Sequence, residues 1–342
     1  ISRVKGEEPV YLLVVGGDGT INEVLNGITD FDKVRFGVIP TGSGNDFGRN
    51  LKLPKTPKES LREICACIRK DQRGEALYRI DLGQVSWEGC EKPRIFGISS
   101  GLGLDALVCK KALHSRLKQV LNRFHLGKLT YLALTVQSLF TMETANAKVV
   151  TEHGGYILPK MIFAAAMNLP AEGGGVPMAP HASVQDGLLS LGSASGIAKW
   201  QTFFLLPFLV AAKQEHINGF TIRNEKGFRL ILDKPMVLHA DGEYCADVTR
   251  VEFRCLEKKL WLLHEQSTEG EKVRPVWEDG TPAYTIKKFG VVNRYDLRKE
   301  FPAMTLRRTA LKSAMDEILW IWQKKSNNIH DLHSHIWDSW AD

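Results

Sequence analysis

The pattern of hydrophobic and polar positions divides the chain into three zones. The first, residues 1–80, alternates short apolar runs with helical patterns, which is typical of an α/β domain. The second, residues 81–264, is richer in strand-like runs and predicts a mainly antiparallel β domain. The third, residues 265–342, opens with a polar stretch that resembles a linker, and five of the eight tryptophans lie in it. The expected strands are 10–15, 34–39, 94–100, 147–151, 156–167, 188–192, 219–223, 228–232, 236–240 and 249–254. One helix is expected directly after Gly19, and others at 57–70, 116–142 and 197–213.

Composition restricts the classes of protein that this chain can belong to. With 342 residues, 44% apolar and 25% charged, it can bury the cores of two globular domains, which argues against disorder. The net charge of +6 lies entirely within residues 1–264; it suits an anionic membrane surface or a polyphosphate, and no nucleic-acid partner is predicted. Six cysteines without a CxxC pair, and no signal peptide, predict a cytoplasmic chain with reduced thiols. The apolar run Trp200–Ala212 is too short to span a bilayer.

A glycine-rich turn joins the first expected strand to the first expected helix. Its residues are Gly16, Gly17, Asp18, Gly19 and Thr20, followed by Asn22 and Glu23 in the first helical turn. Glycines let backbone N–H groups approach phosphate oxygens closely, and a helix N-terminus carries partial positive charge. The turn therefore predicts a phosphate site.

A second loop of small and polar residues follows the next expected strand. It runs through Thr41, Gly42, Ser43, Gly44, Asn45 and Asp46. Loops at the ends of consecutive parallel strands converge on one crevice, so both are expected to contact the same ligand. The alternative for Asn45 and Asp46 is simple helix capping.

Two familiar nucleotide motifs do not account for these loops. Neither loop fits GxxxxGK[ST], which excludes a P-loop NTPase. Residues 101–106 match GxGxxA, but no acidic residue follows about twenty positions later to hold a ribose, which argues against a dinucleotide fold.

Taken together, the motifs resemble the bacterial diacylglycerol kinase and lipid kinase family. They are GGDGTINEVLNG from residue 16, IPTGSGNDFGRNL from 39, RIDLG from 79, SSGLGLDA from 99, QDGLLSL from 185 and DGE at 241–243. GGDGT alone is shared with NAD kinases, whereas the combination is specific. The resemblance implies ATP and Mg²⁺ between an α/β catalytic domain (1–80) and a β-sandwich domain (81–264), and a lipid substrate at a membrane surface, which would bring the chain to the inner face of the membrane. A homodimer is left open.

The resemblance also implies roles for individual residues. Residues 16–20, Glu23, Thr41, Gly42, Ser43, Asn45 and Asp46 would bind the nucleotide, and Asp186 matches a structural metal position of some members. The alternative for Asp186 is a turn before a strand. Phosphoryl transfer to a hydroxyl needs a base. Glu243 is the favoured candidate, with Asp241 beside it; Asp18 is the other candidate, or else organises Mg²⁺. By itself, Asp241-Gly242-Glu243 would also serve as a hairpin turn. Asp81 and Asp105 are expected to support the same cleft.

The start of the chain departs from the family pattern. The family opens with a strand and a loop that contacts phosphate, whereas here Ile1 comes almost directly before the run at 10–15. We therefore expect a truncated N-terminus and a chain that is unstable or inactive as a kinase.

From Val273 the sequence resembles the N-terminal part of a thymidylate synthase. Arg274 would then hold the nucleotide phosphate, Glu317 would belong to the catalytic water network, and Trp337 would border the folate site. For Glu317 alone, an exposed carboxylate on a helix is the alternative. Thymidylate synthases use a cysteine thiolate, and no cysteine follows Cys255. The expectation is an α+β fragment (265–342) without synthase activity, and a chain that fuses two incomplete coding regions.

Four functions therefore stand as hypotheses. A lipid kinase comes first, and an NAD kinase-like enzyme of the same superfamily second. The third is a fragment that binds nucleotide or lipid without turnover, and the fourth is a thymidylate synthase.

Overall fold

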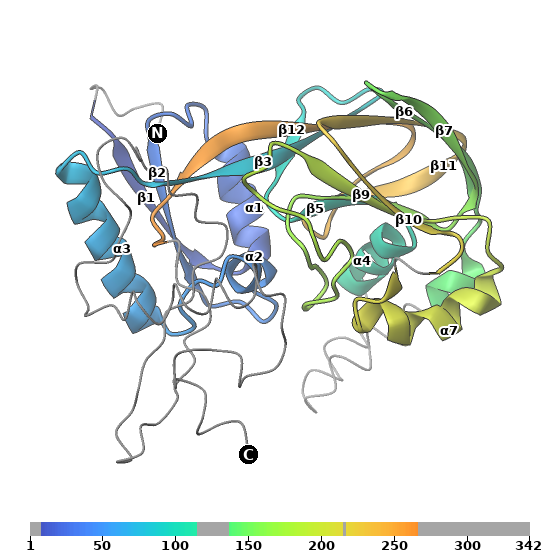
Figure 1. The fold of residues 1–342 in the computed structure, drawn as a ribbon, viewed down its shortest axis with the longest axis horizontal. Helices are drawn as coiled ribbons and strands as arrows, with labels where there is room; N and C mark the ends of the chain where they lie inside the picture. The colour runs from blue at the N-terminus through green and yellow to red at the C-terminus, as the bar shows by residue number, and fades with distance from the viewer. Residues whose placement is uncertain (1–7, 115–136, 215–216, 266–342) are drawn as a thin grey trace, which may run out of the picture. The chain divides into compact units, whose positions relative to one another are not determined.

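The computed structural model describes residues 8–114, 137–214 and 217–265 (Figure 1). The chain divides into two units, Ile1–Gln266 and Ser267–Asp342, and every described residue belongs to the first. In chain order the elements are β1 (Val10–Gly16), α1 (Asp18–Gly27), β2 (Val34–Pro40), α2 (Asp46–Asn50), α3 (Pro57–Gln72), β3 (Tyr78–Trp87), β4 (Arg94–Phe96), β5 (Ser99–Gly103), α4 (Leu104–His114), β6 (Ala145–Thr151), β7 (Gly154–Met161), β8 (Phe163–Met167), β9 (Leu189–Ala194), α7 (Lys199–Val210), β10 (Phe220–Glu225), β11 (Gly227–Ala240) and β12 (Glu243–Leu262).

The first part of the structure is the predicted α/β domain. Strands β1 and β2 pair in parallel, and helices α1 and α3 flank them on opposite sides (Figure 1). Strand β2 alternates its side chains between two cores: Phe36 packs with Leu25 of α1, while Ile39 packs with Ile64 of α3. Because both faces of the sheet are covered, its strands read as continuous apolar runs, which is why the sequence predicts them well.

The second part is a mainly antiparallel β-sandwich domain, also as predicted. Strand β11 pairs antiparallel with β12, β5 and β6, and the path continues from β5 through β8 and β9 to β10. The expected strands 228–232 and 236–240 are one strand, β11, whose register against β12 shifts between Ile231 and Met236. Strand β5 has antiparallel neighbours on both sides, so the GxGxxA match at 101–106 does not sit in a parallel dinucleotide-binding unit.

Strand β12 belongs to both parts. Its middle packs Val251 and Phe253 into the core of the β domain, while Leu260 and Leu262 reach the core beneath α1. Its last residues pair in parallel with β2. Strand β3, which the sequence analysis missed, also serves both cores and contains the predicted domain boundary at 80/81. The boundary remains a prediction.

Within the described segments, no helix is long and apolar enough to cross a membrane. The expected helix at 116–142 lies mostly outside these segments; residues 137–141 are helical. The α+β fragment expected at 265–342 lies outside them too, apart from Glu265.

Candidate active site

The two small-residue loops meet at the carboxyl ends of β1 and β2. The backbone N–H of Thr41 donates a hydrogen bond to the carbonyl of Gly16 at 3.0 Å. A Cβ atom on Gly42 would lie 2.5 Å from the Cα of Gly17, closer than real Cβ atoms come to other atoms. Only glycine allows this approach of the two backbones. The sequence analysis expected the loops to converge, and the geometry of the chain agrees.

Asp18 fastens the second loop to the first. Its carboxylate accepts hydrogen bonds from the backbone N–H groups of Asp46 and Phe47, each at 3.0 Å, and so caps helix α2 from a different loop. Asn45 stands at the N-cap position with a left-handed backbone (φ 50°) but does not cap the helix with its side chain. It binds the N–H and the carbonyl of Gly42 instead. The capping alternative considered for Asn45 is therefore wrong.

The remaining predicted nucleotide contacts sit on the outer side of these loops. Thr20, Thr41 and Ser43 are exposed and stay predictions. Glu23 is exposed on α1, whereas its neighbour Asn22 is fully buried and points toward the second domain. The contact that this helix makes with the rest of the site therefore comes from Asn22.

Asp241 and Gly242 form the two-residue turn between β11 and β12. Both have positive φ values, 48° and 83°, as a type I′ hairpin turn requires. The Asp241 carboxylate accepts hydrogen bonds from the backbone N–H groups of Gly97, Ile98 and Ser99 and from Nδ2 of Asn22, at 2.8 to 3.0 Å. Burial raises its pKa, and these donors oppose that rise.

All four donors belong to the protein itself, so the Asp241 carboxylate holds the turn in place. The catalytic roles suggested for Asp241 and Glu243 stay predictions.

Glu243 follows this turn and faces the glycine-rich loop. Its Oε1 atom lies 3.4 Å from the position that a Cβ on Gly19 would occupy. Among the described residues, no side chain or backbone group forms a hydrogen bond with the Glu243 carboxylate. The carboxylate thus lies beside the N-terminus of α1 and is available to a ligand.

A third loop, which the sequence analysis did not consider, closes over the second. The backbone N–H of Gly174 donates to Asp46 at 2.8 Å, and Nη1 of Arg49 lies 2.8 Å from the other Asp46 oxygen. Burial raises the pKa of Asp46, with the nearby Asp18 carboxylate adding to the effect. The signal that could have revealed this loop is the run of three glycines at 173–175.

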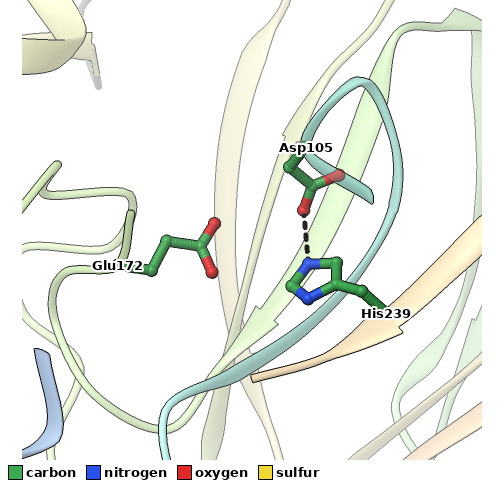
Figure 2. A group of neighbouring side chains, drawn as sticks. All are labelled: Asp105, Glu172 and His239. Atoms are coloured by element: carbon green, nitrogen blue, oxygen red, sulfur yellow. Dashed lines mark hydrogen bonds and ion pairs between the residues drawn. The ribbon is translucent and has the colours of Figure 1, made fainter. Parts of the chain in front are cut away.

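Glu172, just before those glycines, lies close to Asp105 of α4 and His239 of β11, and the three side chains form a cluster (Figure 2). Nε2 of His239 lies 3.0 Å from a carboxylate oxygen of Asp105, and the hydroxyl of Ser99 donates to Glu172. Burial raises the pKa of Glu172 to about 7. The sequence analysis expected Asp105 to support the cleft but gave no role to Glu172 or His239.

Asp81 and Asp186 lie in another part of the β domain framework. The buried Asp81 carboxylate accepts hydrogen bonds from the N–H groups of Gly187 and Lys258, at 2.8 and 2.6 Å. It thereby holds the turn on which Asp186 is exposed, and Asp186 accepts from the N–H of Leu188 at 3.0 Å. The group of three potential metal ligands among the described residues is Asp105, Glu172 and His239, and does not include Asp186. Asp186 as a metal ligand stays a prediction.

Comparisons with known proteins agree with this arrangement. Residues 2–75 match the family model of the diacylglycerol kinase catalytic domain, and residues 99–264 match that of the YegS C-terminal NAD kinase beta sandwich-like domain. The chain is 30% identical to a diacylglycerol kinase of Bacillus subtilis over 239 residues, which is 68% of this chain and 71% of that protein. The chain belongs to the diacylglycerol kinase family.

Two further comparisons agree with this family in sequence or in fold. The chain is 27% identical over 244 residues to YtlR of Bacillus subtilis, whose name assigns it provisionally to the lipid kinases; the match covers 71% of this chain and 77% of YtlR. A crystal structure of a diacylglycerol kinase from Bacillus anthracis superposes with a TM-score of 0.51 at 17% identity, over 75% of this chain and 76% of that one. At this identity the superposition supports the fold alone.

The last part of the chain matches a different family. Residues 262–342 match the thymidylate synthase family model. A thymidylate synthase of Bacillus subtilis subsp. natto is 45% identical over 78 residues, which is 22% of this chain but 28% of that protein. The predicted join between two families is therefore confirmed. Arg274, Glu317 and Trp337 lie outside the described residues and stay predictions.

Proposed function

We propose that this chain transfers the γ-phosphoryl group of ATP to the hydroxyl of a lipid, with Mg²⁺ as the assisting ion and Glu243 as the base. The observation that carries the proposal is the position of the Glu243 carboxylate, 3.4 Å from where a Cβ on Gly19 would lie. A carboxylate from the β domain thus faces the glycine-rich loop, where phosphates are expected. This geometry supports the proposal, because a base at this position would reach the end of a polyphosphate bound by the loop.

The glycine-rich loop suits the phosphates of ATP. Gly17 is the N-cap residue of α1, a ten-residue helix whose first N–H groups have no partner within the helix. These N–H groups and the positive end of the helix favour an anion. The close approach of Gly17 and Gly42 keeps side chains out of the space that the phosphates need.

Mg²⁺ suits the carboxylates of the same loops. Asp18 and Asp46 supply hard oxygen atoms, which are the ligands that this ion prefers. A Cβ on Gly44 would lie 3.1 Å from an Asp18 oxygen and 3.9 Å from an Asp46 oxygen, so the two carboxylates border the same small space. When bound, the ion would neutralise charge on the phosphates; the residues of this chain would hold it and position the lipid hydroxyl near Glu243.

The base assignment has a simple chemical reason. Asp18 already accepts two backbone hydrogen bonds, one on each carboxylate oxygen, so its side chain is engaged in holding the second loop. Glu243 has no such partner among the described residues. We therefore assign proton abstraction to Glu243 and loop positioning, with Mg²⁺ binding, to Asp18.

A radiolabel assay tests the proposal directly. The purified chain is incubated with [γ-³²P]ATP and Mg²⁺, and with mixed micelles containing diacylglycerol, micelles without lipid substrate, or NAD. The proposal expects ³²P in the lipid fraction of the reaction with diacylglycerol micelles, and no labelled product in the other two reactions. Label in NADP would instead favour the NAD kinase hypothesis. ATP binding without transfer to diacylglycerol, sphingosine, phosphatidylglycerol or undecaprenol would favour a binding fragment without turnover.

A further inference from the structure

His239 has two hydrogen bonds that together define its protonation form. Its Nδ1 atom lies 3.1 Å from the backbone nitrogen of Gly242, and its Nε2 atom lies 3.0 Å from a carboxylate oxygen of Asp105. A backbone N–H can only donate, so Nδ1 must accept and cannot carry a proton. A carboxylate accepts, so the proton of the neutral ring belongs on Nε2.

This arrangement argues against His239 as a metal ligand. A metal at Nε2 needs that nitrogen free of its proton, while the other ring nitrogen carries one. Here Nδ1 faces the N–H of Gly242 and has no room for a proton. The cluster of Asp105, Glu172 and His239 in Figure 2 is therefore better explained by hydrogen bonding within the protein.

The partner of Nδ1 gives this histidine its significance. Gly242 is the second residue of the type I′ turn, with φ 83°, and Glu243 follows directly. The first residue of the turn, Asp241, is held through its carboxylate by segment 97–99 and Asn22. The N–H of Gly242 is held by His239, so each residue of the turn has its own anchor.

We propose that His239 is a positioning residue for phosphoryl transfer: through Nδ1 it fixes the Gly242 end of the turn and so aims the Glu243 carboxylate at the glycine-rich loop. The inference rests on the proposed function of Glu243 as the base. Asp105 serves the same purpose one step further away, because it holds the proton on Nε2 and leaves Nδ1 as an acceptor. Displacing a catalytic group by about 1 Å can lower a rate by on the order of 100-fold.

Two substitutions separate the two ends of the imidazole ring. In His239→Asn the side-chain oxygen can take the place of Nδ1 and accept from Gly242, but nothing reaches Asp105. In His239→Gln the amide can reach Asp105 in place of Nε2, but no acceptor stands at the position of Nδ1. A role limited to packing or to stability would make the variant that keeps the Asp105 contact the better enzyme.

The proposal expects the opposite order. The kcat of His239→Asn should stay within about threefold of the wild type, while that of His239→Gln should fall by about 10- to 100-fold with the KM for ATP changed less than about threefold. Thermal melts of both variants accompany the assay. Equal losses of kcat, or a greater loss in His239→Asn, would overturn the proposal.

Spectroscopy tests the hydrogen bond between the Gly242 N–H and Nδ1 of His239 without an activity assay. Long-range ¹H–¹⁵N spectra at pH 8 should show the Nε2–H form of His239. The Gly242 amide should exchange with solvent more slowly in the wild type and His239→Asn than in His239→Gln. An Nδ1–H form, a charged ring, or equal exchange of the Gly242 amide in the wild type and both variants would show that His239 does not hold the turn. If the wild type phosphorylates no lipid, the proposed function fails, and this arm still decides whether His239 holds the turn.

Discussion

Nδ2 of Asn22 lies 2.8 Å from a carboxylate oxygen of Asp241, a hydrogen bond that joins residues 219 positions apart. The same amide nitrogen donates to the carbonyl of Ile95, and the amide oxygen accepts from Arg94 at 2.8 Å. One fully buried side chain therefore ties the helix of the glycine-rich loop to the turn that carries Glu243. The two halves of the site depend on each other through this contact.

Asn22→Asp should weaken the folded chain. The change replaces a donor to Asp241 by a second carboxylate in a buried position, where like charges and lost donors are costly. We expect a loss of about 2–4 kcal/mol in the free energy of unfolding at pH 7, measured by urea denaturation. Glu23→Gln, on the exposed face of the same helix, is the control and should change the value by less than about 0.5 kcal/mol. Equal stability of the two variants would contradict the role of Asn22.

Gly42→Ala should impair nucleotide binding. The new Cβ would lie 2.5 Å from the Cα of Gly17, so the two loops must move apart. We expect the Kd for ATP, measured by titration calorimetry with Mg²⁺, to rise by at least about tenfold, and the free energy of unfolding to fall by about 1–3 kcal/mol. Gly27→Ala is the matched control, since nothing lies within 4 Å of the Cβ that it would add. ATP binding that is unaffected in both variants would mean that the ligand does not use this junction.

Strands β1, β2 and β3 show how much of the fold could be predicted from the sequence. The runs at 10–15 and 34–39 predicted β1 and β2 because both faces of that sheet are covered, and the parallel strands then brought the glycine-rich loops together. Strand β3 was missed because Asp81 and Gly83 interrupt its apolar pattern. The buried Asp81 is stable there because the N–H groups of Gly187 and Lys258 bind it. Gly187 and Lys258 are far from Asp81 in the sequence, so the local sequence pattern does not predict these hydrogen bonds.

The same limit applies to the site. The DGE motif was found by resemblance, and its alternative reading as a hairpin turn is also correct, because one segment serves both purposes. The sequence of the motif does not indicate which of its two carboxylates lacks hydrogen-bond donors from the protein. It depends on the four donors around Asp241, which come from α1 and from segment 97–99. His239 and Glu172 were missed for the same reason.

Substitution of the two candidate bases should separate their roles. Glu243→Gln keeps the shape of the side chain but removes its basicity, and we expect kcat to fall by about 100- to 10,000-fold while the Kd for ATP stays within about threefold. Asp18→Asn should weaken the cap of α2, with a higher Kd for ATP and a loss of about 1–2 kcal/mol in stability. The measurements are steady-state kinetics with diacylglycerol micelles, calorimetry with ATP and urea denaturation. The opposite pattern would make Asp18 the base.

Glu172→Gln should change the pH dependence of stability. Burial raises the pKa of Glu172 from 4.5 to about 7 in the folded chain; the carboxylates of Asp105 and Asp46 add to the rise, and the hydrogen bond from Ser99 opposes it. Between these two pKa values the folded chain binds more protons at this site than the unfolded chain. The stability contribution of the neutral carboxyl is therefore fully present below about pH 4.5 and is lost as the pH rises through about 7.

Glutamine stays neutral at every pH and avoids this loss. The free energy of unfolding of Glu172→Gln minus that of the wild type should therefore be about 1–3 kcal/mol larger at pH 8 than at pH 5, as measured by urea denaturation at both values. Glu152→Gln is the control, because Glu152 is exposed in the turn between β6 and β7, and it should change the free energy of unfolding by less than about 0.5 kcal/mol at either pH. A difference for Glu172→Gln that is equal at the two pH values would mean that this carboxyl is charged in the folded chain throughout the range. The Glu172 carboxylate would then need a cation beside it, and the cluster with Asp105 and His239 would have to be reconsidered as a metal site.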